Sequence, residues 1–258
     1  METILKIPFE TANLLKNLAE KYESPEFLED DPSQFLRFYK NPEDAELLAF
    51  VTSLLSFGSR KAFIPKINFL RDLSAPSIKN WIFEKKFYSD LKNCTDDLQK
   101  KFYRFYSYAD LIDLFEEINE ILQKSSSFGK YFHEKTLEML DSFSGERRIL
   151  LQSLISSSFK KSKMVPKGKN SANKRINMFL RWMVRSSCVD LGLWSWWSKR
   201  DLIIPLDVHV LEESKKLGLI SKKSGATLKT ALLLTKTLEQ IWPDDPVKGD
   251  FALFGLGV

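Results

Sequence analysis

Apolar residues recur at every third or fourth position along nearly the whole chain, and this helical period limits its fold more than any other feature. The stretches "FETANLLKNLAEKYE" (residues 9–23) and "SANKRINMFLRWMVRSS" (residues 171–187) both show it. The only convincing strand pattern is the short run from Leu202 to Leu206. We therefore predict an all-α fold: one unit over residues 1–258, with approximate lobes at 46–189 and at 1–45 plus 190–258.

Residues that favour helix ends refine this prediction. Asn41 is expected to cap a helix with Pro42 at its first position, and Gly58 is expected to end that helix. A further helix is predicted at residues 59–73, with Pro65 near its start or kinking it. The aromatic stretch at residues 96–125 predicts one or two long helices, whose rings form core rather than a base-stacking platform.

The cysteine and histidine content argues against a metal or a cofactor. Cys94 and Cys188 are too few for an iron–sulfur site or a disulfide framework, and we expect both to be packed as small apolar residues. His133 and His209 are far apart and lack a zinc-ligand spacing. No apolar run approaches the length of about 20 residues that spans a membrane. We expect a monomeric, cytoplasmic protein with no metal, no cofactor and no membrane partner.

The net charge of +5 suits a polyanionic partner, although many basic proteins bind no nucleic acid. Seven Lys and Arg residues and no acidic residue lie between Lys160 and Arg175, around a central Pro-Lys-Gly. A basic turn before a helix offers cations and free backbone N–H groups to a phosphate, and Asn170 or Ser171 could cap that helix. The alternative is a solvated basic loop.

Two residues, one at the end of this stretch and one after it, are candidates for chemistry, although a lysine in such a place can also be a solvated surface residue. Lys174 falls in the first turn of the next helix, where the helix N-terminus and neighbouring cations disfavour an added positive charge and favour a nucleophilic amine. Asp207 follows the apolar run in "LIIPLDVHV" (residues 202–210) and opens another helix. Asp207 is either an N-cap or a catalytic carboxylate, and the two roles are compatible.

From Glu46 onward the chain resembles the helix-hairpin-helix DNA glycosylases, the superfamily of endonuclease III and 8-oxoguanine glycosylase. Three stretches carry the resemblance: "ELLAFVTSLLSFGSRKAFIPKINFL" (46–70), "IIPLDVHVLEESKKLGLI" (203–220) and "LEQIWPDDPVKGDFALFGLGV" (238–258). The second is the most specific, because it is similar to the family's Pro-Val-Asp-x-His-Val segment. The resemblance implies two helical lobes around a DNA-binding cleft, with Asp207 as the family aspartate.

The hairpin departs from the family pattern. The turn reads "MVPKGKNSANKR" (164–175), one glycine of the usual Leu-Pro-Gly-x-Gly is missing, and Asn170 falls where a strict alignment puts the catalytic lysine. Lys174 lies 33 residues before Asp207 (207 − 174), a separation similar to the archaeal 8-oxoguanine glycosylase branch. We expect Lys174 to be the nucleophile, with Lys169 as the second candidate.

By the same resemblance, further residues receive roles. The residues expected to contact DNA are Gly58, Ser59, Arg60, Lys167, Gly168, Lys169, Asn170, Ser171 and Arg175. Trp194, Trp196 and Trp197 either line a base pocket or pack the two lobes together, and His209 either steadies Asp207 or packs locally. Arg181 and Arg185 could reach phosphate or a buried acid.

The function that the resemblance implies is base-excision repair. The partner is double-stranded DNA with an oxidised base such as 8-oxoguanine, removed by a lysine Schiff base with strand cleavage, in a nucleoid-associated cytoplasmic protein. The alternatives are a non-catalytic DNA-binding module with the same fold and a helical interaction protein with no nucleic-acid role.

Overall fold

The computed structural model describes residues 4–29, 31–142, 150–168 and 170–256. Its contacts divide the chain into two compact units: unit 1 is Met1–Asp31 with Gly168–Val258, and unit 2 is Pro32–Lys167. These bounds differ from the lobes expected from the sequence, because the helix that begins at Lys174 falls in unit 1 together with Asp207. Unit 2 is thus inserted between two segments of unit 1.

The described chain is mostly helical, so the all-α class is confirmed at that coarse level. Within its described residues, unit 2 contains seven α-helices, one 3-10 helix and a two-stranded hairpin. Its elements are η2 (Pro32–Phe35), α2 (Pro42–Leu55), α3 (Arg60–Leu73), α4 (Ile78–Phe83), α5 (Phe87–Asn93), β1 (Lys101–Tyr103), β2 (Tyr106–Ser107), α6 (Tyr108–Leu122), α7 (Phe128–Ser142) and α8 (Leu151–Ser158).

Helix α2 begins as its sequence predicts. The Asn41 side chain accepts hydrogen bonds from the backbone N–H groups of Glu43 and Asp44, and Pro42 occupies the first helical position. The prediction that Gly58 ends this helix is wrong. The helix ends at Leu55, and Gly58 lies three residues later in the turn to α3, with a φ of +82°.

The helical prediction for residues 96–125 is wrong in its first part, where β1 pairs with β2. The Ser107 side chain accepts from the N–H of Asp110, whose carboxylate accepts from the N–H of Ser107, and this capping box fixes the start of α6. Arg104, with a φ of +51°, makes the hairpin turn. The run from Leu202 to Leu206 is buried but forms no strand.

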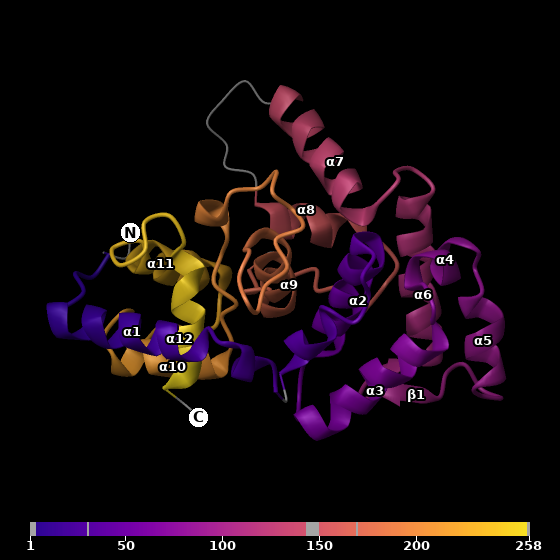
Figure 1. Cartoon of the computed structure of the whole chain (residues 1–258), viewed down its shortest axis with the longest axis horizontal. Helices are drawn as coiled ribbons and strands as arrows, with labels where there is room; N and C mark the ends of the chain where they lie inside the picture. Colours follow the sequence, from indigo (N-terminus) through magenta and orange to yellow (C-terminus); the bar gives the residue numbers. More distant parts are fainter. Residues whose placement is uncertain (1–3, 30, 143–149, 169, 257–258) are drawn as a thin grey trace. The chain divides into compact units, whose positions relative to one another are not determined.

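Most aromatic residues of unit 2 form core, as expected, but Phe105 in the hairpin is 66% exposed. Phe115 packs edge-on against Trp81 with ring centroids 5.0 Å apart, and Phe128 packs against Phe50 at 4.8 Å. In Figure 1, α4, α5 and α6 lie together, and both shorter helices contact α6. The base-stacking alternative for these rings is therefore not needed to explain their spacing.

Buried carboxylates hold the backbone of unit 2. Glu117 is 5% exposed and accepts from the backbone N–H groups of Lys160, Lys161 and Ser162, the last two at 2.9 and 2.8 Å. The start of the basic stretch is therefore already bound by an internal anion.

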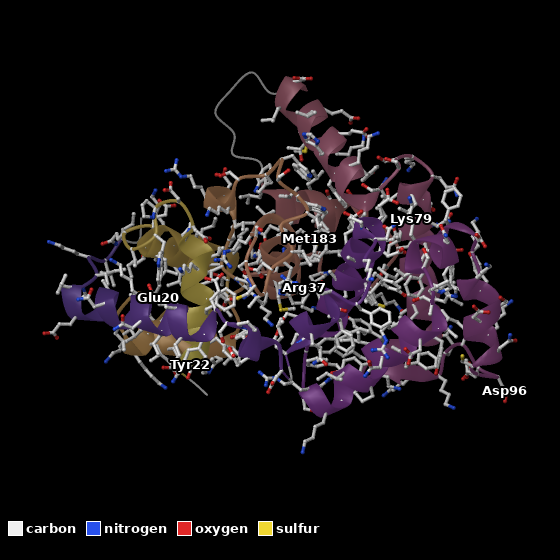
Figure 2. The ribbon with its side chains drawn as sticks, in the orientation of Figure 1. Glu20, Tyr22, Arg37, Lys79, Asp96 and Met183 are labelled. Atoms are coloured by element: carbon white, nitrogen blue, oxygen red, sulfur yellow. The ribbon has the colours of Figure 1, made fainter. Side chains whose placement is uncertain are left out.

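At the surface, Lys79 (labelled in Figure 2) pairs with Glu43 of α2.

Unit 1 contains the remaining helices. They are α1 (Phe9–Tyr22), η1 (Pro25–Leu28), α9 (Lys174–Val184), η3 (Lys199–Asp201), α10 (Val208–Lys216), α11 (Leu228–Leu238), η4 (Pro246–Lys248) and α12 (Gly249–Gly255). Figure 1 shows α1, α12 and α10 side by side, and α12 contacts both of the others. The expected burial of Cys94 and Cys188 is wrong, since both are exposed.

The close approach of α1 and α12 depends on Gly255. A Cβ atom at this position would lie 2.1 Å from a ring carbon of Tyr22, which is labelled on α1 in Figure 2. Such a contact is far inside van der Waals distance, so any side chain here would push the two helices apart.

We predict that Gly255→Ala lowers the free energy of unfolding by about 1–3 kcal/mol, because the Tyr22 ring or the α1 backbone must move. Urea unfolding followed by circular dichroism measures the loss. Gly225→Ala is the matched control in unit 1, since the nearest atom to its added Cβ lies 4.0 Å away. Equal stability of the two variants would contradict the close packing of α1 on α12.

Candidate active site at the starts of two helices

Lys174 is the first residue of α9, and the chain enters this helix through Asn173. Asn173 is the N-cap in the left-handed conformation (φ +47°), and its buried Oδ1 has no hydrogen-bond partner. The prediction that Asn170 or Ser171 caps this helix is therefore wrong. The carbonyl of Asn170 instead accepts from Leu228 N–H at 2.8 Å, which ties the entry segment to the start of α11.

Asp207 is the N-cap of α10, as predicted. Its Oδ1 accepts a hydrogen bond from the backbone N–H of Val210 at 2.9 Å. The preceding run is fixed in the core, where Ile204 N–H donates to Thr235 Oγ1 at 3.0 Å. This buried anchor places the Asp207 carboxylate at a set position, and its second oxygen stays available for other partners.

The two residues are close together within unit 1. The Nζ atom of Lys174 lies 4.0 Å from Oδ2 of Asp207, beyond hydrogen-bond distance but within ion-pair range. The same Nζ donates to the sulfur of Met178 at 3.3 Å. The Lys174 and Asp207 side chains are 31% and 42% exposed, so a ligand can reach both. An amine beside an accessible carboxylate can act as a nucleophile with a proton acceptor.

Arg181 of α9 and Arg185, which directly follows this helix, lie on the same face as Lys174, because steps of 7 and 11 residues are close to two and three full turns. Arg181 donates to Asp190 at 3.2 Å and pairs with Asp250. Arg185 also pairs with Asp190. Both arginines are almost fully buried. The sequence-based expectation that these arginines could reach a buried acid is confirmed.

Arg185 collects further carboxylates from distant parts of unit 1. It contacts Asp245 at 2.9 Å and Glu23, at the end of α1, at 2.8 Å. We call the set Glu23, Arg181, Arg185, Asp190, Asp245 and Asp250 the ionic core. The sequence analysis did not identify the acidic members, because they are scattered along the chain. The two arginines on an otherwise apolar helix face were the signal that buried acidic partners exist.

Burial changes the acidity of two members of the ionic core. It raises the pKa of Asp190 above its ordinary value, against the lowering effect of the two guanidinium groups. It also raises the pKa of Asp250, where the Arg181 guanidinium opposes it. The Asp207 carboxylate raises the pKa of Asp250 as well, whereas the Lys174 ammonium lowers it. The ionic core therefore interacts electrostatically with the Lys174–Asp207 pair.

The remaining residues expected to contact DNA are distributed over both units. Gly58, Ser59 and Arg60 form the turn into α3 in unit 2, where a Cβ on Gly58 would meet Arg104 Nη1 at 2.7 Å. In the basic stretch, the Lys167 ammonium donates to the carbonyl of Lys160, and the carbonyl of Gly168 accepts from Ser171 N–H. Arg175 is the second residue of α9, directly after Lys174. Lys169 lies outside the described residues. The structure leaves their DNA contacts as predictions.

The tryptophan loop lies in unit 1. Trp194 is buried, and its ring lies edge-on to Phe179 of α9 with the ring centroids 5.3 Å apart. The Trp196 ring stacks on the Trp194 ring, also with a centroid distance of 5.3 Å. Trp197 is half-buried beside Trp196. His209 has a buried Nε2 without a hydrogen-bond partner. A role in a base pocket stays a prediction for all four.

We predict that Arg185→Met lowers the free energy of unfolding by about 3–5 kcal/mol at neutral pH, because it strands buried carboxylates. The loss should shrink in acid. Burial already raises the folded-state pKa of Asp190, and removing Arg185 removes a cause that lowers it. A carboxyl group whose pKa is higher in the folded state than in the unfolded state stabilises the folded state when it is protonated. This stabilisation is complete at a pH below the unfolded-state pKa and is lost as the pH rises through the folded-state pKa.

Urea unfolding at about pH 5 and about pH 8 measures the difference. Arg200→Met is the control, because the Arg200–Asp244 pair is exposed (63% and 68%) and such pairs contribute less than about 1 kcal/mol. A loss for Arg185→Met that is small or independent of pH would contradict the buried ionic core.

No helix within the described ranges is both long and apolar enough to cross a membrane. Among the same residues, no three His, Cys, Asp or Glu side chains are grouped so that they could hold a metal ion. Neither a curated protein nor a solved structure matches the sequence. A family model matches residues 31–258, which include all of α9, Asp207 and α12. The chain therefore belongs to the family described as "Protein of unknown function (DUF2400)".

Proposed function

We propose that the protein is a base-excision DNA glycosylase with strand-cleaving (AP lyase) activity, of the helix-hairpin-helix type. The observation that carries the proposal is the 4.0 Å approach of Lys174 to Asp207, at the starts of two helices and within reach of a ligand. The sequence resemblance implies roles for these two residues independently of the distance between them. Their closeness supports those roles, since the chemistry needs an amine and a carboxylate in one site.

The proposed reaction begins when the damaged nucleotide is flipped out of the duplex, because its C1′ atom cannot be attacked inside the stack. The neutral Lys174 amine forms a bond to C1′, and the base departs with the electron pair of the glycosidic bond. Attack leaves two protons on the Lys174 nitrogen. The nitrogen loses one of them, its lone pair forms a C=N bond as the C1′–O4′ bond of the sugar breaks, and O4′ takes up a proton, which gives a protonated Schiff base. Loss of a C2′ proton breaks the C3′–O bond by β-elimination, and Asp207 accepts protons and stabilises the cationic sugar.

The proposed substrate is duplex DNA with an oxidised purine, 8-oxoguanine. This assignment rests on the long lysine-to-aspartate separation, which is similar to the archaeal 8-oxoguanine glycosylases. Such an enzyme works on the chromosome, so we place it in the cytoplasm at the nucleoid. Basic residues of the turn into α3 and of the Lys160–Arg175 stretch would contact phosphates.

We predict that borohydride traps a covalent adduct between wild-type protein and duplexes with 8-oxoguanine or an abasic site, and no adduct with undamaged duplex. Lys174→Ala should abolish the adduct, because it removes the amine. Asp207→Asn should slow trapping by about 10²-fold or more. Asn is as good an N-cap as Asp, so this variant should keep its melting temperature, whereas Asp207→Ala should also lose about 1 kcal/mol of stability.

Lys199→Ala, an exposed lysine in the same unit, is the control for non-specific trapping. An adduct that survives Lys174→Ala but not Lys169→Ala would move the nucleophile into the turn. Absence of any adduct, together with salt-sensitive DNA binding, would reject the Schiff-base mechanism. It would favour a DNA-binding protein that has this fold without the chemistry.

We predict that DNA binding weakens linearly with the logarithm of salt concentration, because each neutralised phosphate releases counterions. Arg60→Ala should reduce the slope by about one, the value for a single phosphate contact. Fluorescence anisotropy of a labelled duplex over a salt series measures the slopes. Lys92→Ala, an exposed cation on α5 in the same unit, should leave the slope unchanged. Binding that does not vary with salt would contradict a nucleic-acid role.

A further inference from the structure

Phe105, in the turn of the β1–β2 hairpin, has the most exposed aromatic ring among the described residues of unit 2. The residue is 66% exposed. One face of its ring lies against Phe57, with the ring centroids 5.3 Å apart and the planes inclined by 29°. Because so much of the side chain is in contact with solvent, the opposite face is open to a ligand.

A fixed aromatic base supports this ring. Tyr103 and Tyr106 pack edge-on against Phe57, with centroid distances of 5.0 and 5.6 Å, and both tyrosines are almost fully buried. The Tyr103 hydroxyl also donates a hydrogen bond to the carbonyl of Phe57, which ties the hairpin to the turn before α3. Figure 1 shows β1 beside α3, and the two elements are in contact. The Phe105 ring is therefore held in place before any ligand binds, so binding costs little conformational entropy.

Positive charge lies next to the open ring. The turn (residues 57–61) and the hairpin (residues 100–106) contain no acidic residue, and all their basic residues are exposed: Arg60, Lys61, Lys100, Lys101 and Arg104. The Arg104 guanidinium lies over the turn, since a Cβ atom added to Gly58 would be 2.7 Å from its Nη1 atom. An aromatic ring bordered by cations is complementary to a strand of nucleic acid, which offers flat bases and charged phosphates.

We propose that these two segments, which we call the hairpin surface, bind single-stranded DNA. One base stacks on the open face of Phe105, and the adjacent phosphates contact Arg104 and its neighbouring cations. A single strand fits better than a duplex, because duplex bases are already stacked on each other and cannot place a face on the ring. Stacking on an aromatic ring tolerates any base, so the hairpin surface should bind without sequence preference. The inference goes beyond the proposed function, because it needs neither Lys174 nor Asp207.

Fluorescence anisotropy of a labelled oligothymidylate over a salt series tests the proposal with full-length protein. We predict that Phe105→Ala weakens binding by about 5- to 100-fold, the loss typical of one stacked base, and leaves the salt slope unchanged because stacking releases no counterions. Arg104→Ala should instead reduce the slope by about 0.7, the value for one phosphate contact on a single strand. Phe105→Trp keeps a stacking ring and should keep the wild-type affinity, whereas Phe105→Leu, which is apolar but has no ring, should not.

Phe38→Ala is the matched control. Phe38 is also an exposed ring of unit 2 (47%), but the Arg71 guanidinium carbon lies 4.7 Å from its centroid and the Tyr39 ring packs edge-on against it. Its removal should leave the single-strand affinity unchanged. Thermal melting followed by circular dichroism shows whether each variant is folded, and Phe105→Leu provides the measurement if the alanine variant is not.

Three results would overturn the proposal: wild-type protein that does not bind the single strand, an affinity unchanged in both Phe105→Ala and Phe105→Leu, or an equal loss in Phe38→Ala. These results do not depend on the borohydride experiment. A loss confined to the Phe105 variants, in a protein that forms no adduct with any duplex, would support the hairpin surface and reject the glycosylase. An adduct formed by a protein whose single-strand affinity does not depend on Phe105 would do the reverse.

Discussion

Arg185 holds together three distant parts of unit 1 with one buried guanidinium group. Its carboxylate partners are at the end of α1 (Glu23), directly after α9 (Asp190) and before η4 (Asp245). Taking these charges out of water is costly, and only complete pairing offsets that cost. These ion pairs therefore fix the position of α9 relative to its neighbours in unit 1. Lys174 is the first residue of this helix, so its backbone position is fixed as well. Placement of the nucleophile candidate is a consequence of ion pairs formed two and three turns away.

Asp207 shows how one side chain can satisfy a structural and a chemical requirement together. One carboxylate oxygen caps α10, and the other faces the Lys174 amine at 4.0 Å. The cap removes the rotational freedom that a catalytic carboxylate would otherwise lose on binding its ligand. The buried run before Asp207 serves the same end, because it fixes the backbone from which the side chain projects. This arrangement explains why an apolar segment ends in a charged residue.

The sequence was informative where a local signal decides the outcome. Asn41 and Pro42 fixed the start of α2, and the alternatives for Asp207 could be stated from its position alone. It failed where tertiary contacts decide. The β1–β2 hairpin has apolar spacing that also fits a helix, and the capping box at Ser107 was overlooked. The cap of α9 could not be foreseen either, since Asn173 is left-handed and follows a segment that is tied to the start of α11 through the carbonyl of Asn170. The four acidic members of the ionic core could not be recognised from the sequence because they are up to 227 residues apart in the chain (250 − 23).

The insertion of unit 2 into unit 1 has a consequence for the order of folding during synthesis. Unit 2 is a continuous segment, so it can fold as soon as its last helix leaves the ribosome. Unit 1 cannot, because α1 is made before unit 2 and its partner α12 is made after it. Until α12 is available, Arg181 lacks Asp250 and Arg185 lacks Asp245, and the apolar face of α1 stays uncovered. The Lys174–Asp207 site is therefore completed only after α12 is made, and without α12 both residues would lack the framework that aligns them.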